Sequence, residues 1–304
     1  MMAVRHGRLA GHTGAGAASG PRRASRAHTV GDALEGAITA ITAAGCETPR
    51  LDAEILLAHV LGVRRERLLL DRELRVEGAA VRAFQDAVRR RAVEREPVAY
   101  IVGHRGFRQL ELAVDRRALV PRPETVLLVE VALTLPRGSR VLDLGTGSGA
   151  VALALKHERP DLDVSASELS EDALELARSN GRRLGLQVRW LRADLLAGVP
   201  DEFGAVLANL PYVADRERAG LAPEIVRHEP PGALFAGGDG LSAIRALLEQ
   251  LAPRKRVDFV ALEVGAGQAT AVGELTGAAG FRTVRFQRDL AGVERVVIGE
   301  GRLR

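Results

Sequence analysis

Two short segments of the sequence place glycines or polar side chains where a buried strand ends. The first is Gly145-Thr146-Gly147-Ser148-Gly149, which follows the run Arg140–Leu144. The second is Asn209-Leu210-Pro211-Tyr212, which follows the apolar run Ala205–Ala208. Glycines at a strand-to-helix turn let the backbone approach a ligand closely. An asparagine side chain offers one carbonyl acceptor and one amide donor group to a planar partner. We therefore expect the first corner to hold a nucleotide-like cofactor and the second to hold an amide or amidine.

The glycine corner predicts a nucleoside site rather than a dinucleotide site. Its spacing is GxGxG, whereas a dinucleotide fingerprint has GxGxxG, and position 150 is alanine. An acid that ends the next strand can accept hydrogen bonds from ribose hydroxyls. S-adenosylmethionine has such a ribose and no pyrophosphate, so a short glycine loop suits it. A tight turn beside an exposed acid is the alternative, and an acid after the third strand can equally be an N-cap. The predicted cofactor-binding residues here are Gly145, Thr146, Gly147, Ser148, Gly149, Glu168, Asp194 and Leu195.

The asparagine corner predicts a site that holds one NH2 group. Leu210 offers its backbone carbonyl, which Pro211 keeps in place because a proline restricts the residue before it. Tyr212 supplies a flat wall. An amide nitrogen is a poor nucleophile, so alignment must supply much of the rate, on the order of 7–11 kcal/mol in favourable cases. A turn beside a core tyrosine is the structural alternative.

The two corners fit a regular alternation of strands and helices in the second half of the chain. The last two predicted strands are close enough to form an antiparallel hairpin. We predict an α/β fold: a seven-stranded Rossmann-like sheet, mostly parallel with an antiparallel edge hairpin, preceded by a small N-terminal helical bundle. The predicted strands are Arg140–Leu144, Asp163–Ser167, Val188–Leu191, Ala205–Ala208, Phe259–Glu263, Thr283–Gln287 and Glu294–Ile298.

The residues before the sheet divide into three parts. Apolar residues recur at three- and four-residue spacing from Val30 onward, which predicts the helical bundle. The connector after it contains two apolar runs, Ala99–Val102 and Leu110–Val114, which we interpret as short strands. We predict a disordered extension over residues 1–29, the bundle over 30–96, the connector over 97–123 and the catalytic domain over 124–304.

Composition and charge narrow the class of protein. Apolar residues make up 46% of the chain and charged residues 27%, and no stretch approaches the roughly 18 apolar residues of a membrane span. The first 30 residues hold five arginines and no acid, and taking these five from the formal +4 leaves −1 for the remainder. A net charge so close to zero after residue 30 argues against a nucleic-acid substrate. Cys46 is the single cysteine, so we expect no intramolecular disulfide and no cysteine-based metal cluster, and we predict no metal site. The helical sequence context of Cys46 predicts a buried position.

Further segments resemble a known family. The glycine loop, Glu168 and Asn209–Tyr212 resemble class I S-adenosylmethionine-dependent N-methyltransferases, whose hallmark is (N/D)PP(Y/F). Residues 119–125, Leu-Val-Pro-Arg-Pro-Glu-Thr, are similar to the PRPET segment of peptide chain release factor glutamine methyltransferases, the HemK/PrmC family. Residues 97–103 followed by Phe107 resemble the linker of that family. Other matching blocks are Glu229-Pro230, Glu263-Val264-Gly265-x-Gly267-Gln268 and Asp289–Gly292, within a resemblance that runs from about residue 30 to 299.

The resemblance implies an enzyme of translation termination that methylates the side-chain amide nitrogen of the glutamine in a Gly-Gly-Gln motif. The helical domain would dock a release factor, and S-adenosylmethionine would be converted to S-adenosylhomocysteine. Leu210 stands where the family has its first proline, and Val126 stands where it often has an acid. The residues carried over are Asn209, Pro211 and Tyr212 as catalytic, Asn209–Tyr212 as substrate-binding, and Asn209, Phe107, Arg122, Glu124 and Thr125 as additions to the cofactor site.

We expect the enzyme to be a cytoplasmic monomer whose partner is a release factor, with no membrane and no nucleic acid. The arginine-rich segment 1–29 also fits an organelle transit peptide, which is the less favoured interpretation. Other acceptors remain open, namely a ribosomal-protein glutamine or adenine N6 of a nucleic acid. A nicotinamide oxidoreductase and a catalytically silent binding module are the alternatives from other classes. The first conflicts with the GxGxG spacing, and the second would require one corner to be degraded.

Overall fold

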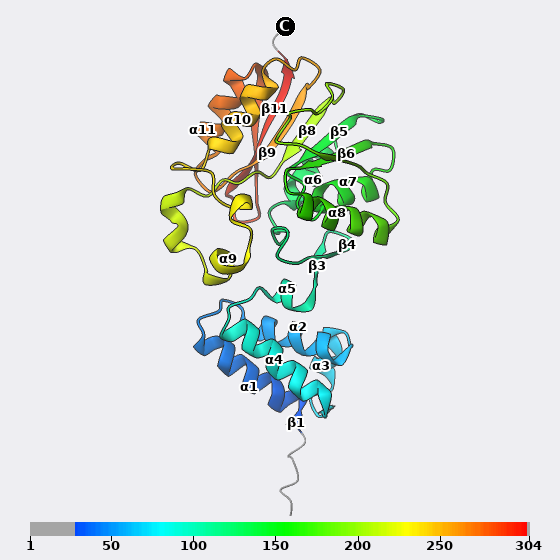
Figure 1. Ribbon diagram of the computed structural model, residues 1–304, viewed down its shortest axis with the longest axis vertical. Helices are drawn as coiled ribbons and strands as arrows, with labels where there is room; N and C mark the ends of the chain where they lie inside the picture. Colours follow the sequence, from blue (N-terminus) through cyan, green and yellow to red (C-terminus); the bar gives the residue numbers. More distant parts are fainter. Residues whose placement is uncertain (1–27, 303–304) are drawn as a thin grey trace, which may run out of the picture.

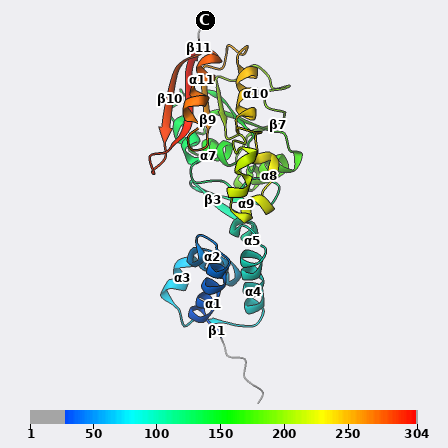
Figure 2. The same ribbon diagram turned by 90° about the vertical axis from the view of Figure 1, so that its left-hand side faces the viewer.

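The structure is a computed structural model that describes residues 28–302. It has two lobes (Figures 1 and 2): a bundle of helices and a twisted sheet flanked by helices. The connector that contains the helix α5 (Val98–Val102) joins them, and the helix α9 (Pro223–His228) lies at the same junction. Residues 1–27 of the predicted extension lie outside the described part, whereas His28–Thr29 form a strand, β1, that pairs with β2 (Arg75–Val76).

The N-terminal lobe is a bundle of amphipathic helices, as predicted. Thr29 begins the first helix with a reciprocal capping box, in which its hydroxyl accepts from the Asp32 N–H and its own N–H donates to the Asp32 carboxylate. Apolar faces meet around fully buried Ile41, Leu56 and Leu68. Cys46 is buried, but it lies in the turn after the first helix rather than in a helix. The helices are α1 (Val30–Ala43), α2 (Pro49–Leu61), α3 (Arg65–Leu70) and α4 (Ala79–Ala92).

The sheet of the second lobe has seven strands in the order β10-β11-β9-β8-β5-β6-β7. The five strands from β5 to β9 run parallel, and β11 pairs antiparallel with both β9 and β10. This topology confirms the predicted fold class, including the reversed edge. The strands are β5 (Arg140–Leu144), β6 (Asp163–Glu168), β7 (Arg189–Arg192), β8 (Ala205–Ala208), β9 (Phe259–Glu263), β10 (Phe281–Arg288) and β11 (Glu294–Arg302).

Helices cover both faces of the sheet, so neighbouring residues of one strand serve different cores. Val141 of β5 packs into the cluster under α6 and α7, and the next residue, Leu142, packs into the cluster under α10 and α11. The strand order reverses beside β5, which has β6 on one side and β8 on the other. A crevice is expected at the carboxyl ends of strands at such a switch point. The helices are α6 (Val126–Ala132), α7 (Ala150–Glu158), α8 (Glu171–Leu184), α10 (Ser242–Leu251) and α11 (Ala269–Ala278).

One predicted strand of the connector is wrong. The run Ala99–Val102 belongs to the helix α5, and the hairpin that follows consists of β3 (His104–Phe107) and β4 (Leu110–Ala113). The β-branched composition favours a strand, but Pro97 begins the helix and Gly103 ends it with a left-handed φ of 79°. Tyr100, which is buried, also donates from its hydroxyl to the Ala118 carbonyl at 2.6 Å. Tertiary contacts therefore override the local preference.

Charged side chains connect the bundle to α9. Arg91 Nη2 donates to Glu224 Oε1 at 3.0 Å, and Arg95 Nη2 donates to Glu224 Oε2 at 2.5 Å. Arg91 also pairs with buried Asp52 at 2.6 Å. The bundle thus contacts the long segment between β8 and β9, which also contains the 3₁₀ turns η1 (Asp215–Gly220) and η2 (Pro231–Ala233).

Candidate active site

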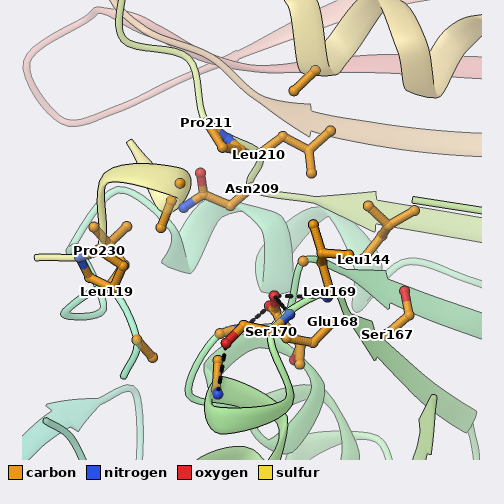
Figure 3. Close-up of a pocket in the computed structure, with 18 of the residues that line it drawn as sticks. Leu119, Leu144, Ser167, Glu168, Leu169, Ser170, Asn209, Leu210, Pro211 and Pro230 are labelled. Carbon is orange, nitrogen blue, oxygen red and sulfur yellow. Dashed lines mark hydrogen bonds between the residues drawn. The ribbon is translucent and has the colours of Figure 1, made fainter. Parts of the chain in front are cut away.

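A cavity of about 580 Å³ opens at the carboxyl ends of β5, β6 and β8. The glycine loop, Glu168 and Asn209 all line it. Figure 3 shows Asn209, Leu210 and Pro211 on one side of this cavity, with Glu168 and Ser170 on the opposite side. The two corners also touch directly, since a Cβ on Gly145 would lie 3.3 Å from Leu210 Cδ2. The fold therefore brings together two segments that lie about 60 residues apart in the sequence.

The glycine loop is held by hydrogen bonds to its neighbours. The N–H groups of Gly145 and Thr146 both donate to the Ser167 carbonyl, at 2.9 and 3.1 Å. Gly145 and Gly147 have φ values of 70° and 56°, a region that favours glycine. Asp143 lies beneath the loop and accepts from the Thr146 hydroxyl at 2.6 Å and from the Ala152 N–H at 3.1 Å. Burial raises the pKa of Asp143 to about 6, although these two hydrogen bonds oppose the rise.

Glu168 joins the glycine loop to the next strand end. Its carboxylate accepts from the Gly147 N–H at 3.0 Å, and from the N–H groups of Leu169 and Ser170 at 2.9 and 3.1 Å. A carboxylate has about four lone-pair positions, so these bonds leave about one for a ligand hydroxyl. The side chain is half-buried and lines the cavity.

The third strand end adds Asp194 and Leu195 to the same cavity. Leu195 has a φ of 51°, a left-handed conformation that costs a non-glycine residue about 1–3 kcal/mol. The Asp194 carbonyl accepts from the Ala197 N–H at 2.9 Å, which closes the turn. Strained backbone conformations of this kind cluster at active sites and ligand-binding positions.

Asn209 continues β8 past the edge of the sheet. Its Nδ2 group donates to the Thr125 hydroxyl at 3.1 Å. Thr125 is buried and lies directly before α6. The Leu210 side chain, which replaces the proline of the family motif, is 5% exposed and packs into the core under α10. Leu210 therefore lines the cavity and also contributes its side chain to the core.

Tyr212 is held from the far side of its loop. Its carbonyl accepts from Gln268 Nε2 at 2.8 Å, while Gln268 Oε1 accepts from the Gly265 N–H at 2.8 Å. A Cβ on Gly240 would lie 2.3 Å from the same carbonyl, so only glycine fits there. Burial raises the pKa of the Tyr212 hydroxyl to about 12, and the neighbouring Glu263 carboxyl adds to the rise.

The third wall of the cavity comes from the segment between β8 and β9. Arg122 Nη2 donates to both oxygens of the buried Glu229 carboxylate, at 2.7 and 2.8 Å. Burial raises the pKa of Glu229, and the Arg122 guanidinium opposes that rise. Pro230 follows directly and lines the cavity beside Leu119 (Figure 3). The pair thus fixes the PRPET segment to this wall of the cavity.

The structure places most of the expected site residues around one cavity, but some lie behind its surface. Phe107 is buried in the core below the sheet. Gly149 packs against Leu153, Ala177 and Trp190, where a Cβ would lie 3.0–3.3 Å from their atoms. Glu124 and Tyr212 are likewise absent from the described residues that form the cavity wall. The expected residues that do form it are Arg122, Thr125, Gly145, Thr146, Gly147, Ser148, Glu168, Asp194, Leu195, Asn209, Leu210 and Pro211.

Asp143, Glu229, Glu263 and Gln268 support the site but were not among the expected site residues. Glu263 is 1% exposed and ends β9, beside the Asn209 corner. Asp143 and Glu263 each lie within or at the end of a buried apolar strand, which is the same signal that singled out Glu168. That signal could have found both acids. Glu229 and Gln268 lie in blocks that resemble the family, but no local pattern indicates their supporting contacts, because their partners are distant in the sequence.

Nowhere within residues 28–302 do three or more His, Cys, Asp or Glu side chains gather so as to hold a metal ion. In the same range, no helix has the length and apolar character needed to cross a membrane.

The sequence matches two family descriptions. Residues 32–103 match the PrmC N-terminal domain, and residues 123–268 match the methyltransferase small domain. The catalytic domain of hMettl16, solved in complex with MAT2A 3'UTR hairpin 6, has the same fold, with a TM-score of 0.52 at 16% identity over 73% of this chain and 81% of that one. The fold and the cavity at its strand ends thus define a Rossmann-like methyltransferase with an N-terminal helical domain.

Curated relatives give the family. A release factor glutamine methyltransferase of Rhodospirillum rubrum is 38% identical, covering 93% of this chain and 89% of its own. Those of Cereibacter sphaeroides and Burkholderia pseudomallei are 42% and 43% identical, covering 88% and 81% of this chain and 96% and 90% of their own. The chain belongs to the release factor glutamine methyltransferase family.

Proposed function

We propose that this enzyme transfers a methyl group from S-adenosylmethionine to the side-chain amide nitrogen of the glutamine in the Gly-Gly-Gln motif of a peptide chain release factor. The observation that carries the proposal is that the Glu168 corner and the Asn209 corner line the same cavity. Similarity to relatives that carry this name over most of the chain supports the choice of acceptor.

The glycine corner fits the cofactor. The cavity of about 580 Å³ is large enough for a nucleoside with an amino-acid chain. Glu168 would accept a hydrogen bond from a ribose hydroxyl, Asp194 would accept from the adenine amine, and Leu195 would pack on the ring. The bound cofactor supplies a methyl group on a positively charged sulfur. The backbone of the loop from Gly145 to Ser148 would face its amino-acid part.

The asparagine corner would bind and orient the acceptor. Asn209 Oδ1 and the Leu210 carbonyl would accept from the two N–H bonds of the substrate amide and turn its nitrogen toward the cofactor. Pro211 would keep that loop rigid, and Tyr212 would support it from behind. Of the remaining assigned residues, Arg122 and Thr125 would shape the cavity wall, and Glu124 and Phe107 would support it from behind. Such alignment can supply on the order of 7–11 kcal/mol of the barrier.

We assign the helical lobe, residues 30–96, to docking of the protein substrate, and residues 124–304 to catalysis. The ion pairs of Arg91 and Arg95 with Glu224 support this division, because they connect the bundle to the segment that walls the cavity. We further propose that the enzyme acts as a monomer in the cytoplasm.

Mass spectrometry of a release factor incubated with the enzyme and an isotopically labelled methyl donor tests the function. The expected result is one added methyl group on the glutamine of the Gly-Gly-Gln motif, formed much more slowly by the Asn209→Ala variant. Methylation of a ribosomal-protein glutamine or of adenine N6 instead, with the release factor unmodified, would overturn the proposal.

A further inference from the structure

Glu263 is a buried acid that the reaction as described leaves unused. Strand β8 lies beside β9 with Ala208 opposite Leu262, so the residues that follow each, Asn209 and Glu263, emerge at the same edge of the sheet. Glu263 is 1% exposed, and its Oε2 atom accepts no hydrogen bond from any residue that the structure describes. A buried carboxyl with an unsatisfied oxygen is costly to keep, which calls for a functional reason.

The surroundings of Glu263 point toward Asn209. The hydroxyls of Thr125 and Tyr212 lie close enough to its carboxyl to lower its pKa. Of the charged groups around it, Arg295, which is paired with Asp289 at 2.9 Å, also lowers the pKa, whereas Glu124 raises it. Burial outweighs these effects and raises the pKa of Glu263 to about 7. Thr125 stands at the N-cap of α6, yet within the described chain its hydroxyl makes no capping bond to that helix. It accepts from Asn209 Nδ2 instead.

The direction of these hydrogen bonds decides which end of the Asn209 amide faces the cavity. A threonine hydroxyl has one hydrogen, and an ionised carboxylate can only accept. If Thr125 donates to Glu263, its free lone pairs favour the NH2 group of Asn209, and Oδ1 is left facing the cavity. A protonated carboxyl or an amide at position 263 can itself donate a hydrogen bond to the Thr125 hydroxyl. Such a side chain therefore no longer forces Thr125 to accept from the NH2 group of Asn209. We propose that Glu263 is a positioning residue, which fixes the side-chain amide of Asn209 through the Thr125 hydroxyl so that Oδ1 is presented to the methyl acceptor.

The inference rests on the proposed function, since it assumes that Asn209 Oδ1 binds the acceptor amide. Its first test is Glu263→Gln in the full-length enzyme, assayed with a release factor. We expect kcat to fall about 10–100-fold, a range typical of groups that orient a ligand from behind, while cofactor affinity changes by less than about twofold. Glu249→Gln, an exposed position on α10, is the matched control and should leave kcat unchanged.

Two readouts separate positioning from a merely structural role. In the wild type, kcat should rise through a midpoint near pH 7 as Glu263 ionises, and Glu263→Gln should remove that rise. Because the pKa of Glu263 is raised in the folded protein, its ionisation destabilises the fold as the pH rises from about 4.5 to 7. Glu263→Gln should therefore leave Tm at pH 8 equal or higher. A lower Tm together with an unchanged pH profile would show a structural role and overturn the inference.

Thr125 provides the second variant pair. Thr125→Ser keeps the hydroxyl and should retain kcat within about threefold, whereas Thr125→Val should lose as much as Glu263→Gln. The double variant Glu263→Gln/Thr125→Val should be no slower than Thr125→Val alone, since both act on one interaction. If the two losses of kcat multiply instead, Glu263 does not act through the Thr125 hydroxyl, and the inference is contradicted.

A readout without substrate keeps this inference distinct from the proposed function. The side-chain NH2 signals of Asn209 in ¹⁵N-labelled wild-type enzyme should shift with a midpoint near pH 7, and they should not do so in Glu263→Gln. An inactive wild type with this titration present would overturn the proposed function alone. Absence of the titration in an active wild type would overturn the inference alone.

Discussion

The cofactor corner and the substrate corner are both strand-end turns, but they are held in place by different kinds of contact. The glycine loop bonds to partners close in sequence, such as Asp143 at Thr146 and Glu168 at Gly147. Asn209 and Tyr212 bond to partners 84 and 56 residues away, Thr125 and Gln268. The cofactor corner is therefore held mainly by nearby segments, with Gln250 as a more distant support, whereas the substrate corner exists only when three distant segments have packed together.

This difference predicts how the two sites respond to mutation. Substitutions outside the motifs should disturb acceptor binding more often than cofactor binding, because more of the supports of the acceptor site are remote in the sequence. Relaxed or altered acceptor choice could then arise without loss of the methyl donor site.

Asn209→Ala should lower kcat about 10²–10³-fold, as for the loss of one preorganised hydrogen-bonding group. The side chain lies at the end of β8 against Thr125, outside the glycine loop, so cofactor affinity should stay within about twofold. Radiolabel transfer to a release factor measures kcat, and calorimetry measures the cofactor Kd. Near-normal transfer by the variant would remove Asn209 from the reaction.

The same contrast explains how much of the molecule the sequence predicted. Strand ends and glycine spacing are local signals, so β5, β8 and β9 were predicted with their observed bounds, and the cavity wall from Gly145 to Ser148 follows from spacing alone. The helix α5 was missed because Pro97 and Gly103 outweigh a β-branched run only once Tyr100 packs into the core.

The supports of the substrate corner could not be predicted from spacing. The Arg122–Glu229 pair joins residues 107 positions apart, and no periodicity encodes such a contact. Phe107 illustrates the converse limit, since a residue carried over from a resemblance proves to be buried in the core. The sequence thus predicts which polar residues lie at strand ends, but it does not predict the long-range contacts that orient them.

Gly240→Ala should destabilise the protein by about 2–4 kcal/mol, because it combines a strained left-handed alanine with an overpacked contact. Gly240 has a φ of 77°, and the new Cβ would overlap the Tyr212 carbonyl. Chemical denaturation measures the change in unfolding free energy. Gly238→Ala, where a Cβ meets open space, is the control and should have little effect. Equal stability of the two variants would show that the Gly240 and Tyr212 loops move apart at no measurable cost in free energy.

Glu168→Ala should weaken cofactor binding by roughly 1.5–3 kcal/mol, the value of hydrogen bonds to a charged group. It also frees the Gly147 N–H, so the loop should loosen as well. Calorimetry measures the affinity, and acceptor KM at saturating cofactor should hold steady. Glu171→Ala, an exposed acid on α8, serves as the control. Unchanged cofactor affinity in Glu168→Ala would exclude this residue from the cofactor site.

Gln268→Ala should raise the acceptor KM about 3–10-fold, since it removes two neutral hydrogen bonds, each contributing about 0.5–1.5 kcal/mol, from behind the Tyr212 loop. Gln250→Ala is the matched variant at the other corner. Gln250 Oε1 accepts from the Leu196 N–H at 2.9 Å, directly after Leu195. That change should weaken cofactor binding and leave acceptor KM alone. Steady-state kinetics measures the acceptor KM of both variants, and calorimetry measures their cofactor Kd. If both KM and Kd change in both variants, the two corners are coupled rather than independent.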